Sequence, residues 1–296
     1  MTGVPDGVRR LAVLGSPIVH SRSPELHAAA YGVLGLPWEY GRVEMTGDGL
    51  AGFVAGLDAS WRGLSLTMPL KVDVLPLLAE RTDLVAATGA ANTVLFAEGG
   101  PRGFNTDVAG VVGALAEHGV TGPRRVHVVG TGATAGSVLA AVAALGATDV
   151  VVSGRNPDGL ADTVALAGRL GLTATSRRYG DPMPWRPDLL AAALPGGVDP
   201  DDIPAADDGD ALLEVPYAPW PTPRAARWLE RGAPVATGLE MLLHQAVEQV
   251  RIFVTGAEGG ALDREAEVIA AMRAVVGLGA PVPGADGRPA PGVGGS

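Results

Sequence analysis

Short apolar runs alternate with helical segments along most of the chain. The expected strands are residues 10–14, 38–43, 62–66, 125–129, 149–153, 172–176, 190–194, 211–215 and 234–236. The expected helices are residues 24–34, 48–58, 69–79, 107–118, 134–145, 158–170, 223–231, 239–253 and 261–277. Because strands that alternate with helices form βαβ units, the pattern predicts an α/β fold built on parallel sheet.

Three segments break this alternation. Residues 92–104, with the letters E-G-G-P in the middle, predict a hairpin between the two halves of the chain. Residues 199–210 hold six aspartates with Pro and Gly, and we expect a solvated loop there. Residues 280–296 are rich in Gly and Pro and are expected to be disordered.

The composition is that of a globular protein with a substantial core. The chain has 296 residues, of which 47% are hydrophobic and 18% charged, enough for one large or two medium domains. Aromatic residues make up only 4%, so Ala, Gly and Val fill the core positions. Such small side chains suit helices packed closely on a parallel sheet.

Charge and residue types exclude several classes of function. The formal net charge of −10 argues against nucleic acid as a main partner, since phosphate binding needs a basic face. The absence of cysteine excludes disulfides, thiolate nucleophiles and cysteine–zinc sites. The five histidines lack metal-binding spacing, so no metal site is expected.

No segment is expected to enter a membrane. The N-terminus has no basic region followed by a long apolar stretch, so we expect no signal peptide and a cytoplasmic location. Residues 126–148 carry no Asp, Glu, Lys or Arg and are long enough to span a bilayer. Their four glycines instead predict a strand, a tight turn and an Ala-rich helix.

Two hydroxyls lie in the loop after the first expected strand. The segment from Gly15 to His27 is G-S-P-I-V-H-S-R-S-P-E-L-H, and its Pro24 suits the first turn of a helix. Ser21 and Ser23 are therefore close to a helix N-terminus, where hydroxyls and free backbone N–H groups suit a small anion such as a carboxylate. The alternative is that Ser23 only caps the helix.

A dinucleotide-binding fingerprint opens the second half of the chain. The strand at 126–129 is followed at once by G-T-G-A-T-A at residues 130–135. Gly130 permits a tight turn, Gly132 lets the backbone approach a pyrophosphate, and Ala135 fills the close-packing third position. The position of the motif between a strand and a helix supports this interpretation.

The tip of the next strand predicts the choice of cofactor. Residues 150–153 lead into Gly154-Arg155-Asn156, and no Asp or Glu stands there to bind a ribose 2′-hydroxyl. Arg155 stands there instead, where an arginine can bind a 2′-phosphate and stack on adenine. NADP is therefore favoured over NAD, and the alternative is that Arg155 is a surface arginine in a loop.

A lysine and an aspartate are candidates for the reacting groups. Residues 62–71, R-G-L-S-L-T-M-P-L-K, predict a strand, a proline-marked turn and Lys71 in the first turn of a helix. A cation is unfavourable there, so Lys71 needs an acidic partner or plain solvent exposure. Asp107 is a candidate partner, although a helix-start carboxylate is a common role for such a residue. Asn92 and Asn105 suit a polyhydroxylated ligand, or else form turns.

An ordered set of motifs resembles the pattern of the shikimate dehydrogenase family. The motifs span residues 15 to 256 and are the glycine fingerprint with G-S-P-I-V-H-S-R-S-P, S-L-T-M-P-L-K, A-N-T, N-T-D, Y-A-P-W-P-T-P and G-L-E-M-L-L-H-Q-A. The resemblance implies reversible, NADPH-dependent reduction of 3-dehydroshikimate to shikimate, on the route to chorismate and the aromatic amino acids. It also implies a monomer or a homodimer.

The resemblance implies a role for each motif residue. Lys71 and Asp107 are the expected catalytic pair. The residues expected to bind the substrate are Ser21, Ser23 and Tyr217 at its carboxylate, and Ser65, Thr67, Asn92 and Gln245 at its ring hydroxyls. The residues expected to bind the cofactor are Gly130, Thr131, Gly132, Ala133, Thr134, Ala135, Arg155 and Gly238.

The family's fold implies two domains. Residues 1–106 are expected to form an α/β substrate-binding domain, and residues 107–237 a Rossmann domain that binds NADP. Helices within residues 238–279 are expected to return to the first domain, with the active site in the cleft between the two.

Several positions depart from the common family pattern. Ser65 stands where most members have Asn, and Ala28 replaces a frequent Asn. Gly136 stands where an Arg often follows the glycine turn, which leaves Arg155 as the main candidate for the 2′-phosphate. The remaining departures are Ala192, Ala193, Glu214 and Pro216.

Three alternative functions follow from these departures and from the fold. A quinate dehydrogenase would share nearly every motif, but changes at the serine pair and an acidic residue favouring NAD are expected there, and neither is present. The sequence does not exclude an aminoshikimate dehydrogenase, and Ser65 is the position at which an aminated substrate would be distinguished. A non-catalytic ligand sensor on the same fold needs no proton donor, so Lys71, Asp107 and Gln245 argue against it.

Overall fold

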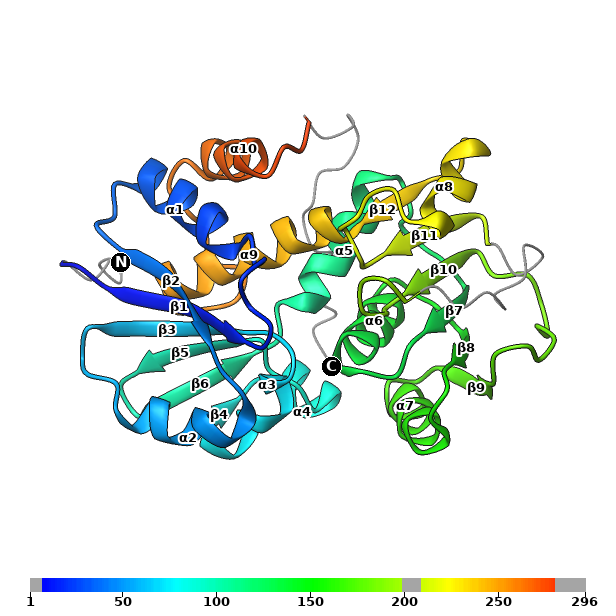
Figure 1. Cartoon of the computed structure of the whole chain (residues 1–296), viewed down its shortest axis with the longest axis horizontal. Coiled ribbons are helices and arrows are strands. Elements are labelled where there is room, and N and C mark those ends of the chain that lie inside the picture. Colours follow the sequence, from blue (N-terminus) through cyan, green and yellow to red (C-terminus); the bar gives the residue numbers. More distant parts are fainter. Residues whose placement is uncertain (1–6, 199–208, 280–296) are drawn as a thin grey trace, which may run out of the picture.

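The chain forms two lobes, each built on a six-stranded sheet (Figure 1). The computed structural model describes residues 7–198 and 209–279. The strand order is β2-β1-β3-β5-β6-β4 in the first sheet and β12-β11-β10-β7-β8-β9 in the second. The tail expected over 280–296, and most of the loop expected over 199–210, lie outside the described residues.

The first sheet combines parallel strand pairs with antiparallel ones. Its strands are β1 (Arg10–Gly15), β2 (Glu39–Glu44), β3 (Trp61–Leu66), β4 (Glu80–Arg81), β5 (Thr93–Ala97) and β6 (Gly100–Phe104). β1 pairs in parallel with β2 and β3, whereas β5 is antiparallel to both β3 and β6. The predicted hairpin at 92–104 is confirmed, and it completes this sheet rather than standing between two sheets.

The helix expected over residues 69–79 is interrupted, and the one expected over 48–58 ends three residues early. The helices are α1 (Ser23–Leu34), α2 (Gly47–Ala55), α3 (Leu70–Asp73), a 3-10 turn η1 (Leu75–Leu77) and α4 (Asp83–Thr88). A single helix was expected over 69–79, but Pro76 has no N–H to donate and its ring obstructs the preceding turn. β4 and α4 were not predicted, because elements of two and six residues show no clear periodicity.

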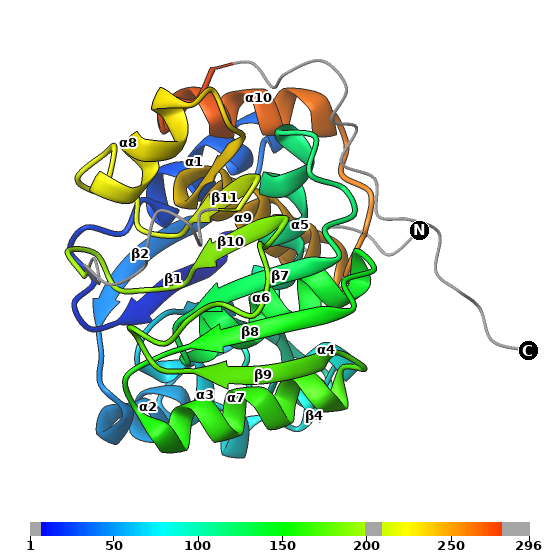
Figure 2. The same cartoon turned by 90° about the vertical axis from the view of Figure 1, so that its right-hand side faces the viewer.

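The second sheet is parallel throughout, as predicted (Figure 2). Its strands are β7 (Arg125–Val129), β8 (Asp149–Ser153), β9 (Thr173–Arg177), β10 (Leu189–Ala192), β11 (Ala211–Glu214) and β12 (Val235–Thr237). The helices of this half are α5 (Asp107–Glu117), α6 (Ala133–Ala144), α7 (Pro157–Arg169) and α8 (Pro223–Glu230). These bounds agree with the predicted ranges to within two residues.

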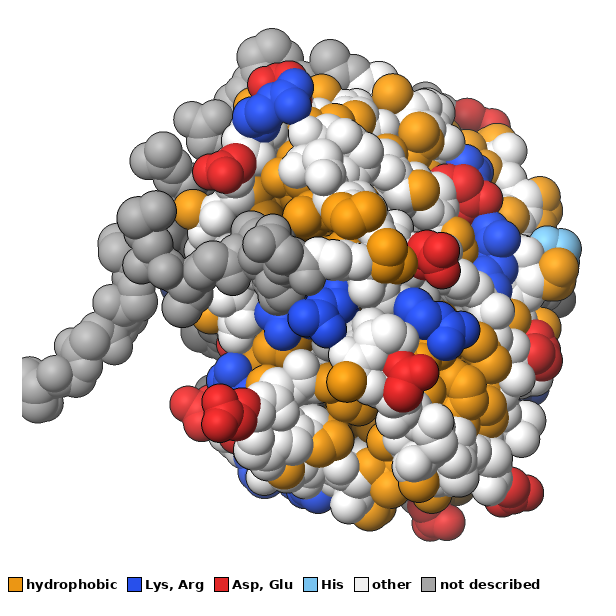
Figure 3. All heavy atoms as spheres, turned by 90° about the vertical axis from the view of Figure 1, so that its left-hand side faces the viewer, with side chains coloured by type: hydrophobic (Ala, Val, Ile, Leu, Met, Phe, Trp, Pro, Cys, Tyr) orange, Lys and Arg blue, Asp and Glu red, His pale blue; other side chains and the backbone are white. Residues whose placement is uncertain are grey.

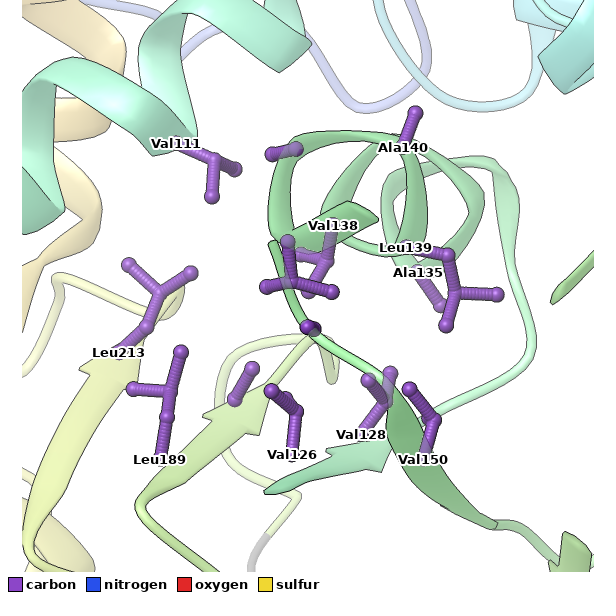
Figure 4. Close-up of a cluster of buried hydrophobic side chains, with 14 of the residues drawn as sticks. Val111, Val126, Val128, Ala135, Val138, Leu139, Ala140, Val150, Leu189 and Leu213 are labelled. Atoms are coloured by element: carbon purple, nitrogen blue, oxygen red, sulfur yellow. The ribbon is translucent and has the colours of Figure 1, made fainter. Parts of the chain in front are cut away.

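Small apolar side chains fill the core of the second lobe. Val126 and Val128 of β7 and Leu189 of β10 face Val138 of α6, and all four are fully buried (Figure 4). Alanines at most remaining positions of α6 let the helix pack closely on the sheet. The prediction that Ala and Val fill the core is confirmed for this lobe, whereas leucines and aromatic side chains are prominent in the core of the first lobe.

The last two helices return to the first lobe. α9 (Gly238–Thr255) starts at a capping box, in which Thr237 and Glu240 satisfy each other's backbone N–H groups. Figure 1 shows α9 beside α5, running from the second lobe into the first. α10 (Glu265–Val275) packs on α1. Phe253 of α9 and Met272 of α10 are buried in one core with Leu11 of β1.

On the face of the first lobe shown in Figure 3, acidic and basic side chains are interspersed. Within residues 7–198 and 209–279, no helix has the length and apolarity required for a bilayer crossing. Over the same ranges, no group of three His, Asp or Glu side chains is arranged to hold a metal ion.

Candidate active site

A cavity of about 280 Å³ lies between the two lobes. Its walls come from the loops after β1, β3 and β11, from the start of α5 and from one face of α9. All nine residues predicted to bind or transform the substrate line it, namely Ser21, Ser23, Ser65, Thr67, Lys71, Asn92, Asp107, Tyr217 and Gln245. Two of the predicted cofactor residues, Thr134 and Gly238, reach the same cavity.

Strand pairing explains why residues distant in sequence meet here. β1 and β3 are parallel neighbours, with Leu14 opposite Leu66, so the loops that follow them leave the sheet at the same edge. The backbone N–H of Ser16 donates to the carbonyl of Met68 at 2.9 Å and fastens the two loops together. One loop supplies the serine pair and the other supplies Thr67 and Lys71.

The predicted contact between Lys71 and Asp107 is confirmed. The Lys71 Nζ lies 2.6 Å from Asp107 Oδ2, and the two side chains are 13% and 7% exposed. The pair is thus shielded from water but open to the cavity. Asp107 is the first residue of α5, yet its carboxylate contacts side chains rather than only capping the helix.

Asn92 holds the second oxygen of this carboxylate. Its Nδ2 donates to Asp107 Oδ1 at 2.8 Å, while its Oδ1 accepts from the backbone N–H of Thr106 at 2.8 Å. Asn105 does not reach the cavity, and its Oδ1 accepts from the backbone N–H of Asp107 at 3.2 Å, so the turn-forming alternative is confirmed for this residue. Its Nδ2 donates to Ser137 of α6 at 3.1 Å, so this buried amide joins the two lobes instead of facing a ligand.

The side chains of Ser21 and Ser23 do not cap α1. α1 begins at Ser23 itself, and the preceding Arg22, at the cap position, makes no side-chain cap bond. The capping alternative for Ser23 is therefore wrong. The Ser21 hydroxyl accepts only a long bond of 3.4 Å from the N–H of Ser23. Tyr217, whose pKa burial raises above its ordinary value, supplies a third hydroxyl from the loop after β11.

The departure at Glu214 has a structural explanation. Glu214 ends β11 and is fully buried, with its Oε2 2.9 Å from Nε of the buried Arg224. Thr222 also donates to Glu214, at 3.0 Å. These contacts close the loop that carries Tyr217, so the ion pair fixes the approach of that hydroxyl to the cavity.

One polar residue of the cavity was missed from the sequence. Gln249 is buried and lines the cavity one helical turn after Gln245 on α9. The spacing of four residues places both amides on the same helix face, and this was the signal that could have found it.

The glycine turn fits a dinucleotide. Gly130 has φ +119, and a Cβ there would lie 2.4 Å from the Ala193 carbonyl oxygen, so only glycine is tolerated. Gly132 precedes α6 and has open space where its Cβ would be, which leaves the helix N-terminus accessible to a phosphate. Ala135 is fully buried, as its packing role requires.

Arg155 lies at the same sheet edge. It follows β8, the parallel neighbour of β7, and is exposed. Ser153, the last residue of β8, is buried, and its hydroxyl lies 2.7 Å from His127 Nε2. Neither Ser153 nor the residues Gly154, Arg155 and Asn156 that follow it offer a carboxylate to a ribose. Gly238 also stands close to a backbone, since a Cβ there would lie 1.8 Å from the Val215 carbonyl oxygen.

Comparisons with known proteins agree with this geometry. The family model for the shikimate dehydrogenase substrate binding domain matches residues 13–94. The shikimate dehydrogenase (NADP(+)) of Ignicoccus hospitalis is 32% identical over 247 residues, which are 82% of this chain and 92% of that protein.

Solved structures are similar over nearly the whole chain. The shikimate dehydrogenase of Mycobacterium tuberculosis has a TM-score of 0.79 at 37% identity, over 90% of this chain and 99% of that one. The shikimate 5-dehydrogenase of Thermus thermophilus, in complex with NADP(H) and shikimate, has a TM-score of 0.76 at 31% identity, over 90% and 99% of the two chains. From its motifs, its cavity and these relatives, the chain belongs to the shikimate dehydrogenase family.

Proposed function

We propose that this protein reduces 3-dehydroshikimate to shikimate reversibly with NADPH, in the formation of chorismate and the aromatic amino acids. The observation that carries the proposal is the Lys71–Asp107 pair, at 2.6 Å, in a cavity that also holds the serine pair and the start of α6. The named relatives support the same substrate and cofactor.

Lys71 and Asp107 act on the proton. NADPH, when bound, supplies the hydride that converts the carbonyl carbon to an alcohol carbon. The oxygen then gains negative charge, and the Lys71 ammonium stabilises it and donates one proton to it, which is worth about 10²- to 10⁴-fold in rate. Asp107 accepts a hydrogen bond from Lys71 and so directs the ammonium. In the reverse reaction the neutral amine accepts the alcohol proton.

The remaining lining residues position the substrate. Ser21, Ser23 and Tyr217 present hydroxyls to the carboxylate at one end of the cavity. The ring hydroxyls meet Ser65, Thr67, Asn92 and Gln245, which as a set offer hydrogen-bond donors and acceptors. Asn92 also touches Asp107, so substrate contact and the catalytic pair share one residue.

The cofactor is held at the edge of the second sheet. The turn from Gly130 to Ala135 with Thr131, Ala133 and Thr134 would hold the pyrophosphate, and Arg155 the 2′-phosphate. Gly238 follows β12 and lines the cavity. The domain boundaries at 106 and 237, the cytoplasmic location and the monomeric or homodimeric state belong to the same proposal.

An assay with NADP and three substrates side by side tests the proposal. Ser65 in place of the common Asn favours aminoshikimate as the second candidate, and quinate is the third substrate. We expect shikimate to give the highest kcat/KM. No turnover of any of the three would point to a ligand sensor and overturn the proposal.

A further inference from the structure

A continuous chain of hydrogen-bonded side chains runs behind the cavity from Tyr40 to Asn92. It consists of Tyr40, Ser65, Gln249, Thr93 and Asn92. Tyr40 is a half-buried residue of β2 that does not line the cavity, and no motif pointed to it. Every other member lines the cavity except Thr93, which is fully buried.

A backbone group fixes the direction of the first bonds in this chain. The N–H of Thr106 donates to Asn92 Oδ1 at 2.8 Å, so that atom is the amide oxygen. The Thr93 hydroxyl, 2.9 Å from the same oxygen, must therefore donate to it. With its hydrogen committed, the Thr93 oxygen can only accept, and it accepts from Gln249 Nε2 at 3.0 Å.

A second backbone group gives the same orientation of Gln249. Its Nε2 also lies 3.4 Å from the Asn92 carbonyl oxygen, which cannot donate. The Gln249 Oε1 must then face Ser65, whose hydroxyl donates to it at 2.9 Å. His27 is stacked on the Tyr40 ring and its Nε2 lies 3.2 Å from the same oxygen. Burial lowers the pKa of His27 to about 3, so the ring is neutral and can donate there through one N–H.

The direction of these hydrogen bonds also fixes the orientation of the Ser65 hydroxyl at the cavity wall. Because the Ser65 hydrogen is directed at Gln249, the Ser65 oxygen accepts from the Tyr40 hydroxyl at 2.6 Å. One lone pair of Ser65 remains, and Ser65 lines the cavity.

We propose that Tyr40 is a positioning residue, which with Gln249 holds Ser65 as a pure hydrogen-bond acceptor for the substrate ring. The inference rests on the proposed function. Such an acceptor binds a ring substituent that carries a hydrogen, either a hydroxyl or an ammonium, and gains nothing from a substituent without one. This property would account for a serine that accommodates both hydroxylated and aminated rings.

A double-mutant cycle with shikimate and NADP tests the proposal. Tyr40→Phe and Ser65→Ala should each raise the KM for shikimate about 5- to 10-fold, with kcat and the KM for NADP within about twofold of the parent. In the Ser65→Ala background, Tyr40→Phe should raise the KM no further, because its effect passes through Ser65.

Tyr31→Phe is the matched control. The buried Tyr31 hydroxyl lies 3.0 Å from Nδ1 of the same histidine, His27, and Tyr31 does not line the cavity. The substitution Tyr31→Phe should lower the melting temperature about as much as Tyr40→Phe does and leave the KM for shikimate unchanged. An equal rise in KM for Tyr31→Phe would assign the effect to packing and overturn the proposal.

A ligand series tests the polarity of Ser65. For the parent enzyme, replacement of one non-reacting ring hydroxyl of shikimate by fluorine should raise the KM as much as Ser65→Ala does with shikimate. Ser65→Ala should not distinguish the two ligands. If the parent enzyme turns over shikimate but the effects of Tyr40→Phe and Ser65→Ala on the KM multiply, this inference is overturned and the proposed function stands. A parent enzyme without turnover would overturn the proposed function, and this inference with it.

Discussion

Lys71 is the only lysine in the chain, in which arginine supplies the other 21 of 22 basic side chains. An arginine stays charged at any working pH, whereas a lysine can release and regain a proton. The one side-chain ammonium of the protein lies in the cavity against Asp107. The residue type and its position therefore agree with a proton donor, and no second lysine can replace it.

At the same scale, Ser21→Ala and Ser23→Ala should each raise the KM for shikimate about tenfold, or about 1.4 kcal/mol, because each removes a hydroxyl from the carboxylate. The KM for NADP and the melting temperature should stay nearly unchanged. Ser16→Ala is the control, since this hydroxyl of the same loop donates to the Glu44 carboxylate outside the cavity. If Ser21→Ala and Ser23→Ala leave the KM for shikimate unchanged but lower the melting temperature, the two serines have a structural role and do not bind the carboxylate.

Arg155→Asp should weaken NADP binding by about 1–3 kcal/mol, because it removes a charge-assisted contact to the 2′-phosphate. The parent should use NADP much better than NAD, and the variant should lose that preference. Arg169→Asp changes the net charge equally at the far end of α7 and should leave the KM for NADP unchanged. Equal kinetics of the parent with both cofactors would refute the assignment.

At the scale of elements, the sequence predicted long, regular elements well and short or long-range features poorly. The parallel strands of the second sheet were found because they are continuous apolar runs. α4 and β4 were missed because they are too short for periodicity. Tyr40 was missed because its role comes from a contact with Ser65 across 25 positions, which no local pattern encodes. For Gln249 the spacing of four residues from Gln245 was a usable local signal, but its contact with Ser65 across 184 positions was not.

Three helices meet at Glu117, a buried carboxylate at the end of α5. It contacts His244 of α9 and Arg273 of α10. Burial would raise the pKa of Glu117, but hydrogen bonds from His244 and Arg273 outweigh it and lower the pKa from 4.5 to about 2. A carboxylate with a lowered folded-state pKa stabilises the fold above pH 4.5, and this contribution is lost as the pH falls toward 2.

Glu117→Gln should therefore lower the free energy of unfolding at pH 7 by about 2–3 kcal/mol, and the gap to the parent should close toward pH 2. Urea unfolding at several pH values measures this. Glu267→Gln is the control, since Glu267 pairs with Arg264 in full exposure and should change little. A gap that is constant with pH would show that Glu117 acts through packing alone.

At the scale of the whole molecule, the site exists only where two lobes meet. The carboxyl ends of β1 and β3 in the first sheet and of β11 in the second lie at the cavity, and α9 carries Gln245 and Gln249 back to it. Periodicity predicted the alternation of strands and helices, whereas the division into two domains was expected only from the family resemblance. The gathering of nine site residues was expected from the family resemblance, because residue spacing alone places no residue across a cleft.

The central claim is that Lys71 and Asp107 form one catalytic unit. A double-mutant cycle tests it most directly, with kcat for shikimate oxidation with NADP as the measured quantity. Lys71→Ala should lower kcat by two orders of magnitude or more, about 3 kcal/mol of barrier, while shikimate still binds. Asp107→Asn should also be severe, and the double variant should be less than additively worse. Near-normal turnover of Lys71→Ala, or fully multiplicative losses, would contradict the proposed unit.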